Sequence, residues 1–428
     1  MKKHFFILLL LIPFFVTGCG KAQTNFSLVN TSHLDELYEE IEFDGKTVGI
    51  IHIYSNYPDY GWIGDDDEGI ACIDDVARAT VFYLKNYEAT GDEASLDKAG
   101  RLVEFILSMQ AENGYYYNFI FEDGTINTTH KNSLPQANWW TWRAMWALME
   151  AYDIYKNIDN DFTNRIFNGI ENAIGAIKEN LPVGRTTNLI EGFEIPTWLP
   201  WKYAADQASV LLLSLVPYYE ISKDEVILEY IRALQDGIIL MQVDDEKAFA
   251  HRAFFSWRNM WHAYGNIQAY SLIISSYLSP DENLLPCALS EINIFYMKLM
   301  EKGYLANFFL TKTGTDIKVK ELNKFSQIAY NIRPMVYACL AAYDITNDST
   351  YTEKAAEIAS WFFGNNPAKA QMYFPVSGIG FDGINSEKEI NRNSGAESTI
   401  EALLTLQAIE NNPIAIEMLF NIYKQLEK

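Results

Sequence analysis

Two acidic segments, far apart in the chain, carry side chains suited to acid–base chemistry. Asp74 and Asp75 follow the acidic loop Asp65 to Glu68, and Glu397 follows the polar segment 392–395 near the other end of the chain. A carboxyl group held in place can give or take a proton during a reaction. A pair of them on opposite sides of a substrate could therefore act as acid and base.

Each of these acids also has a plain structural explanation. Asp74 or Asp75 could cap a helix, with Arg78 as a local ion-pair partner. Glu397 lies near a helix start, where a negative charge suits the helix dipole. The loop Asp65 to Glu68 could bind calcium, or it could simply be solvated. No histidine pair has ligand spacing, so we expect no metal and no other cofactor.

Aromatic and polar side chains cluster in the same regions of the chain. Sugar rings offer apolar faces that stack on aromatic rings and hydroxyls that pair with polar groups, so such clusters suit carbohydrate binding. A core position is the alternative for any single aromatic residue. The predicted substrate-binding residues are Trp140, Arg143, Trp198, Asp206, Trp257, Arg258, His262, Asn331, Tyr373 and Arg392.

Repeated helical hairpins must position these side chains. After a strand-like run at 46–53, the 3.6-residue period recurs in about six pairs of segments, spaced by roughly 60 residues. The pairs are 74–87 with 94–109, 139–155 with 162–180, 203–219 with 224–242, 260–277 with 285–300, 326–343 with 351–363, and 394–409 with 414–425.

The two helices of each pair differ in polarity. The first is apolar nearly all round, as at Val210 to Leu213, and the second carries more charge, as at Lys354 and Glu357. Helices apolar on every side are buried, so we expect inner helices ringed by outer ones. This arrangement resembles the all-α (α/α)6 toroid of the six-hairpin glycosidases. An open helical solenoid is the alternative. In a closed ring, the starts of the inner helices would share one face.

The C-terminal sixty residues, roughly, resemble those of family-nine glycoside hydrolases, which are cellulase-like six-hairpin enzymes. The resemblance rests on Gly364-Asn365-Asn366-Pro367, a Gly-rich loop at 378–383, and the segment that ends in Glu397. In that family, the glutamate of the last inner helix is the general acid, which implies this role for Glu397. The family's Asp-Ala-Gly-Asp segment is absent, and the nearest counterpart here is Asp74-Asp75.

The resemblance implies a glycoside hydrolase with two carboxyl groups. Glu397 would protonate the leaving oxygen, and Asp75, with Asp74 as second choice, would activate water, inverting the anomeric centre. Two alternatives stay open. A polysaccharide lyase or sugar epimerase on the same fold would instead use His251-Arg252 and Trp257-Arg258, and a glycan-binding protein would use the aromatic residues alone.

The N-terminal segment predicts export and anchoring. Lys2 and Lys3 precede an apolar run too short to span a bilayer, and this run ends at Val16-Thr17-Gly18-Cys19. This resembles the lipobox of bacterial lipoproteins, which implies a signal peptide at 1–18, a lipid on Cys19, a tether at 19–45 and a toroid domain at 46–428. We expect a monomer, held to the cell membrane outside the cytoplasm by its lipid alone.

Composition narrows the classes of partner and of scaffold. With 49% hydrophobic residues, the chain of 428 residues can bury a large core. Its formal net charge of -23 argues against nucleic-acid binding, which needs cations against phosphates. With Cys19 lipidated, only Cys72, Cys287 and Cys339 remain, so we expect no disulfide scaffold.

Overall fold

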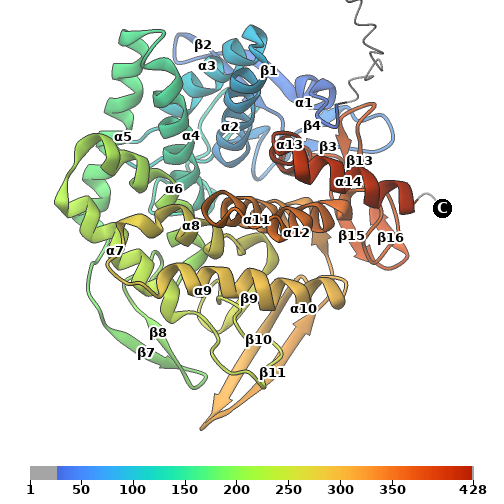
Figure 1. Ribbon diagram of the computed structural model, residues 1–428. Helices are drawn as coiled ribbons and strands as arrows, with labels where there is room; N and C mark the ends of the chain where they lie inside the picture. Colours follow the sequence, from blue (N-terminus) through green and yellow to red (C-terminus); the bar gives the residue numbers. More distant parts are fainter. Residues whose placement is uncertain (1–26, 427–428) are drawn as a thin grey trace, which may run out of the picture.

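The structure, a computed structural model, describes residues 27–426. Its core is a ring of six inner helices, in which each contacts the next and the last returns to the first (Figure 1). The inner helices are α2 (Ile73–Thr90), α4 (Trp139–Tyr155), α6 (Ala205–Ser222), α8 (Gln268–Ser275), α11 (Arg333–Thr346) and α13 (Ala396–Glu410). Because α13 packs against α2, the ring is closed, and the predicted toroid is confirmed over an open solenoid.

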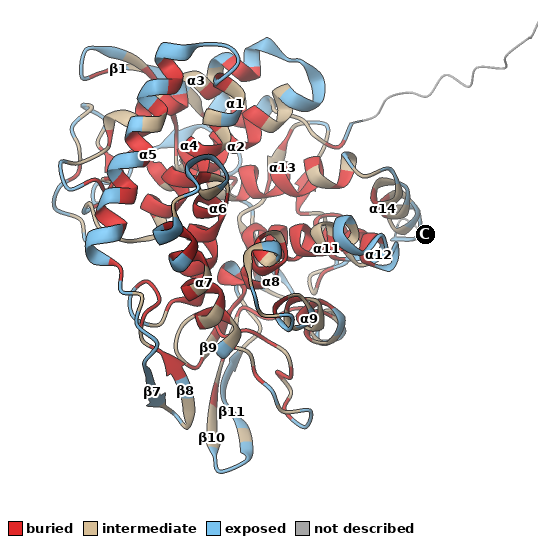
Figure 2. Cartoon of the chain, turned by 60° about the vertical axis from the view of Figure 1, so that its left-hand side comes forward, coloured by how far each residue is buried: buried red, intermediate tan, exposed pale blue. Residues whose placement is uncertain are grey.

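An outer layer of helices covers this ring. It consists of α3 (Glu93–Ser108), α5 (Asn160–Asn180), α7 (Glu225–Leu240), α9 (Leu284–Ser290) with α10 (Tyr296–Glu301), α12 (Thr350–Ala359) and α14 (Pro413–Leu426). Buried residues dominate the inner helices, whereas the outer helices alternate buried and exposed faces (Figure 2). The polarity difference in the sequence therefore distinguishes the apolar inner helices from the more polar outer helices.

Local signals fix where these helices begin and end. Asp92 and Asp224 accept hydrogen bonds from the first free backbone N–H groups of α3 and α7, as N-caps do. Gly91 ends α2 in the left-handed conformation, with φ of 71°. The short turns between partners make each pair antiparallel, so all inner helices start on the same face of the ring.

The fourth pair departs from the predicted pattern. The segment expected as one helix at 260–277 begins as strand β9 (Met260–His262) and a 3-10 turn, and only then becomes α8. Its partner contains the π-helical segment Glu291–Phe295 between α9 and α10. Apolar periodicity alone does not distinguish a buried strand from a buried helix. The sequence pattern therefore predicted continuous helices in both segments of this pair.

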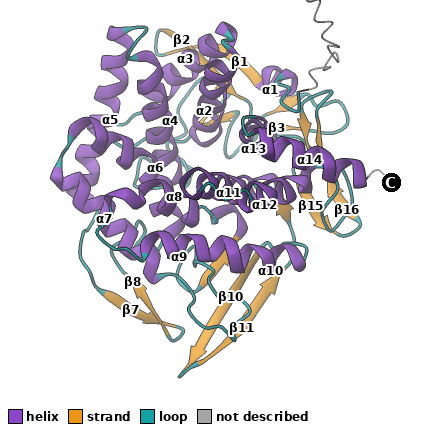
Figure 3. Cartoon of the chain, viewed as in Figure 1, coloured by secondary structure: helices purple, strands orange, loops and turns teal. Residues whose placement is uncertain are grey.

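Short strands form the connections between helices (Figure 3). They are β3 (Tyr54–Ser55), β4 (Trp62–Ile63), β5 (Ala71–Cys72), β6 (Phe119–Ile120), β7 (Thr187–Ile190), β8 (Phe193–Pro196), β10 (Asn307–Thr313), β11 (Asp316–Asn323), β12 (Gln327–Ile328), β13 (Tyr373–Phe374), β14 (Ile379–Gly380), β15 (Gly383–Ser386) and β16 (Glu389–Asn391). The hairpins β7–β8 and β10–β11 project from one end of the molecule.

The N-terminal part of the domain starts earlier than the sequence suggested. Helix α1 (Ser32–Leu37) and strand β1 (Tyr38–Phe43) lie within the expected tether, and β1 pairs antiparallel with β2 (Lys46–Ile51). Leu34 and Leu37 are buried in the core. The boundary at residue 46 therefore falls inside a hairpin, whereas Cys19 and the signal peptide lie outside the described residues. No helix between residues 27 and 426 is long and apolar enough to cross a bilayer.

Candidate active site

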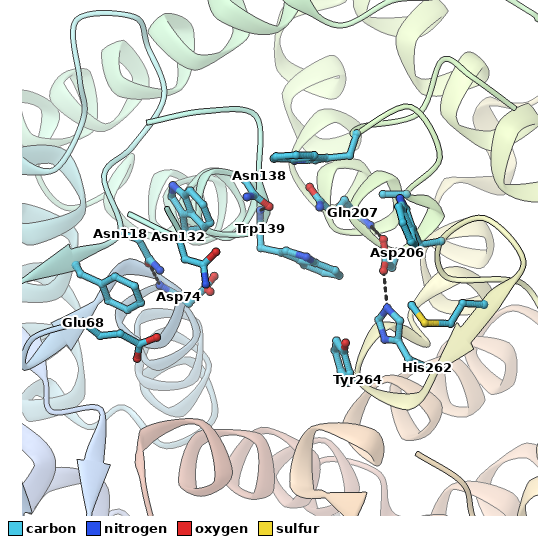
Figure 4. Close-up of a pocket in the computed structure, with 16 residues that line it drawn as sticks. Glu68, Asp74, Asn118, Asn132, Asn138, Trp139, Asp206, Gln207, His262 and Tyr264 are labelled. Carbon is cyan, nitrogen blue, oxygen red and sulfur yellow. Dashed lines mark hydrogen bonds and ion pairs between the residues drawn. The ribbon is translucent and has the colours of Figure 1, made fainter. Parts of the chain in front are cut away.

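The starts of the first four inner helices surround a cavity of about 550 Å³. Figure 4 shows Asp74 on one side of this cavity and the Asp206–His262 pair on the other, with Trp139 between them. Its lining residues are Glu68, Asp74, Asn118, Phe119, Asn132, Asn138, Trp139, Trp140, Trp201, Ala204, Asp206, Gln207, Trp257, Met260, His262 and Tyr264. Aromatic rings and amide groups dominate this lining.

The aromatic walls come from helix starts and the loops before them. Trp140 lies in the first turn of α4, where its Nε1–H donates to the Tyr116 carbonyl at 2.7 Å, which fixes its ring. Trp201 is 53% exposed, and its backbone is left-handed, with φ of 51°. An exposed aromatic ring on a strained backbone is unusual for a structural residue, and such strain clusters at functional sites.

Asp74 is the carboxyl group at the start of α2 that faces the cavity. One of its oxygens forms an ion pair with Nη1 of Arg143 on α4 at 2.6 Å, and its backbone N–H donates to Asn118. The side chain stays 21% exposed. Asp74 is thus oriented by α4 and still open to a bound molecule.

Asp75, the next residue, is enclosed by protein and does not line the cavity. Its two oxygens accept hydrogen bonds from Arg78 at 2.7 Å and from the Cys72 thiol at 3.2 Å. Burial raises the pKa of Asp75 to about 6, although Arg78 acts in the opposite direction. The preferred base of the sequence analysis therefore lies behind the cavity wall.

Arg78 joins the first inner helix to the last. Its Nη1 donates to Glu397 at 2.9 Å and to Glu401 at 3.2 Å, while Nη2 binds Asp75. Burial by itself disfavours a charge here, but Glu397, Asp75 and Glu401 together raise the pKa of Arg78 above its ordinary value. Arg78 is therefore a permanent cation at the contact of α2 with α13.

Glu397 keeps one side open at this contact. Its Oε2 accepts the Arg78 hydrogen bond, and its side chain is 43% exposed. Burial, followed by the charges of Asp206 and Glu397, raises the pKa of Tyr264 on the cavity wall. The charges of both acids therefore act on Tyr264, which lines the cavity.

A histidine–carboxylate pair lines the cavity beside Tyr264. Nε2 of His262 lies 2.8 Å from Oδ2 of Asp206, and the Tyr264 ring stacks on the imidazole with centroids 3.8 Å apart. Gly265 is required beside them, because a Cβ there would approach the His262 ring to 2.2 Å. The other ring nitrogen of His262, Nδ1, is buried and has no hydrogen-bond partner within residues 27–426.

The structure separates the predicted binding residues into two groups. Trp140, Asp206, Trp257 and His262 line the cavity, and Arg143 lies directly behind Asp74. Arg258 stacks on the rings of Trp257 and Tyr203, and Asn331 is buried between Tyr330 and α11.

The remaining three predicted binding residues lie away from the cavity. Trp198 is a core residue that donates to the Ala233 carbonyl on α7. Tyr373 is fully buried and donates to the Leu28 carbonyl. The Arg392 guanidinium lies over the ring of Tyr57. None of these three side chains lines the cavity.

Sequence reasoning missed several lining residues. Tyr264, Asn118, Asn132 and Asn138 gave no signal, because single polar residues outside regular helices have no period. Glu68 belongs to the acidic loop that was considered for calcium, and there it accepts a hydrogen bond from the Tyr54 hydroxyl. Within residues 27–426, no cluster of three or more His, Cys, Asp or Glu side chains is arranged to hold a metal ion.

The sequence matches no protein-family model and no curated protein, but solved structures match the fold. A sugar epimerase from a ruminal bacterium matches with a TM-score of 0.61 and 12% identity, over 89% of this chain and 95% of its own. A cellobiose 2-epimerase from Bacillus thermoamylovorans matches with a TM-score of 0.60 and 13% identity, over 90% and 96%. A glycoside hydrolase family 9 endoglucanase matches with a TM-score of 0.51 and 12% identity, over 88% and 83%.

These matches establish the fold. The chain is an (α/α)6 toroid, like the sugar epimerases and the family-nine endoglucanase, as the sequence pattern predicted. At such low identity, a shared fold leaves the reaction open, because one fold hosts many chemistries.

Proposed function

We propose that this protein is a carbohydrate-active enzyme and that it hydrolyses glycosidic bonds. One observation carries the proposal: a cavity walled by four tryptophans has the carboxyl group of Asp74 in its lining, and Arg78 of the same helix binds the partly exposed Glu397 at the start of α13. Two carboxyl groups beside an aromatic-lined cavity are the elements that glycoside hydrolysis requires.

The reaction would divide its two proton transfers between these acids. Glu397 gives its proton to the glycosidic oxygen as the bond to the anomeric carbon breaks. Asp74 takes a proton from the water that attacks the opposite face of the sugar ring. Asp74 replaces Asp75 in this role, because Asp75 is enclosed between Arg78 and Cys72. Attack from the opposite face inverts the anomeric centre.

The lining supports a sugar ligand in two ways. Trp139, Trp140, Trp201 and Trp257 offer rings for stacking against the C–H faces of sugars. The amides of Asn118, Asn132, Asn138 and Gln207 can both donate to hydroxyls and accept from them. A site built to pair many hydroxyls discriminates between sugars by the groups it leaves unpaired.

A second candidate function is sugar epimerisation, and the His262–Asp206 pair favours it. A histidine oriented by a carboxylate can remove a proton from a carbon beside a sugar carbonyl. Two of the matched structures are described as epimerases. In this mechanism, His262 would be essential and Asp74 would only bind substrate.

One experiment separates the two candidates. The purified protein is incubated with a panel of polysaccharides and oligosaccharides, and the products are followed by NMR and chromatography. We expect shorter sugars whose first-formed anomer is inverted. A product of unchanged length with an altered sugar identifies the epimerase, a double-bond absorbance identifies a lyase, and binding without any product leaves a glycan-binding protein.

A further inference from the structure

Glu401 lies one helical turn beyond Glu397 on α13 and is completely buried. Both of its oxygens are occupied: Oε1 accepts from Nη1 of Arg78 at 3.2 Å, and Oε2 accepts from Nε of Arg333 on α11. A group with no exposed surface and both oxygens bound does not touch a substrate. Its effect must pass through its partners.

The partner that matters is Arg78. The same Nη1 that binds Glu401 also donates to Glu397, and Nη2 donates to Asp75. A guanidinium is a rigid planar fork, so holding one of its edges fixes the direction of the others. Nε of Arg78 is bound to the Asp74 carbonyl at 3.1 Å, so Glu401 is one of four partners that together fix the guanidinium, and it is the one that also binds Arg333.

Repulsion between the arginines explains why a carboxylate is needed there. Arg78, Arg143 and Arg333 each lie 5.3 Å from the centre of the Tyr330 ring. Three buried cations around one ring repel one another strongly unless anions lie between them. Glu401 is the anion that Arg78 and Arg333 share.

We propose that Glu401 is a positioning residue, which holds the Arg78 guanidinium between Arg333 and the active-site acids so that Glu397 is aimed at the cavity. The inference rests on the proposed function, in which Glu397 delivers the proton. Without Glu401, the Arg78 guanidinium turns away from Arg333. Glu397, which is bound to Arg78, then leaves the position from which it delivers the proton.

The first test compares turnover in two matched variants. Glu401→Gln keeps the shape and removes the charge, and we expect kcat to fall by about 10²-fold, the cost of a small misplacement of a catalytic group. KM should stay within about twofold, because the cavity walls are unchanged. Glu291→Gln is the control, since Glu291 is equally buried but accepts from the Phe254 N–H rather than from an arginine of this cluster, and it should turn over normally. Normal kcat in Glu401→Gln would overturn the proposal.

The second test needs no turnover. NMR of isotope-labelled arginine side chains, with Arg78→Lys to assign the signal, reports whether the Arg78 guanidinium is held rigid. We expect a rigid signal in the wild type and in Glu291→Gln, and a mobile one in Glu401→Gln. If the wild type cleaves no glycan, the proposed function fails, and this spectrum still decides the positioning role.

A third variant addresses stability. Glu401→Gln combined with Arg333→Gln removes one charge of each sign from the buried cluster, so the cluster keeps its charge balance. We expect this double variant to fold and to recover much of the kcat and of the Arg78 rigidity that Glu401→Gln loses, because the Arg333 cation that repels Arg78 is also gone. If both the single and the double variant fail to fold, Glu401 is a residue of stability alone and the proposal is rejected.

Discussion

Neighbouring residues on α2 have different surroundings. Asp74 faces the cavity beside Arg143, whereas Asp75 points into the contact with Arg78 and Cys72. Successive residues of a helix point about 100° apart, so one of two adjacent acids can serve a substrate while the other holds the scaffold. Substitution of Asp74 should therefore affect turnover, whereas substitution of Asp75 should affect stability.

We predict opposite outcomes for Asp74→Asn and Asp75→Asn. Asp74→Asn should lower kcat by about 10²- to 10⁴-fold and leave the fold intact, because a partly exposed base loses its charge. Asp75→Asn should destabilise the protein by about 3–5 kcal/mol, because Arg78 loses a buried partner. Rates and thermal unfolding of both variants check this. A stable, inactive Asp75→Asn with an active Asp74→Asn would return the base to Asp75.

Glu397→Gln should abolish nearly all turnover while folding and glycan binding persist. The change keeps the shape and removes only the transferable proton, so the loss should be about 10²- to 10⁴-fold. Glu389→Gln, on the exposed hairpin before α13, is the matched control. Full activity in a destabilised Glu397→Gln protein would remove the main support for a hydrolase and favour the epimerase or the binding protein.

At the scale of elements, the irregular fourth pair carries a buried acid of its own. Glu291 begins the π-helical segment between α9 and α10 and is fully buried, with the Phe254 N–H as a donor at 2.9 Å. Burial raises the pKa of Glu291 to about 8. Near neutral pH this carboxyl group therefore keeps its proton in the folded protein.

Glu291 should make stability depend on pH. Its folded pKa lies above its ordinary value of 4.5, so the folded state binds the proton more tightly than the unfolded state. Its contribution is fully present below the ordinary pKa and is lost as the pH rises towards about 8. We expect the Tm of Glu291→Gln, measured relative to that of the wild type, to rise steadily from about pH 5 to 8. Glu301→Gln, exposed on α10, should show no such trend, and a constant difference for Glu291→Gln would contradict the assignment.

At the scale of the whole molecule, ion pairs between α2 and α13 lie where the ring closes. Arg78 and Glu397 are 319 positions apart, and their contact brings the first inner helix to the last. The cavity walls come from α2, α4, α6 and the segment before α8, and closure of the ring adds the contact of Glu397 on α13 with Arg78 on α2.

Cys19 lies outside the described residues, and its lipidation stays a prediction. Cys19→Ala should move the protein from the membrane fraction to the soluble fraction of the producing cells, because the lipid is the expected anchor. Cys287→Ala, which changes a free cysteine on α9, should remain in the membrane fraction. A Cys19→Ala protein that stays fully bound would show that something else holds it.

The sequence by itself determined the hairpin ring and the ends of most helices. Apolar periodicity, caps and short turns act within a few residues, so they can be recognised without knowing the rest of the fold. They also placed Asp74, Asp206 and Glu397 at the starts of inner helices, which share one face in any closed ring.

Only the tertiary structure decided which of these residues meet. The choice between Asp74 and Asp75 depends on how α2 is rotated against α4 and α13, and the burial of Trp198 and Tyr373 depends on elements packed over them. The sharing of Glu401 between Arg78 and Arg333 requires three helices at once. Such contacts are set by the packing of whole helices and loops against one another, and no local pattern in the chain encodes them.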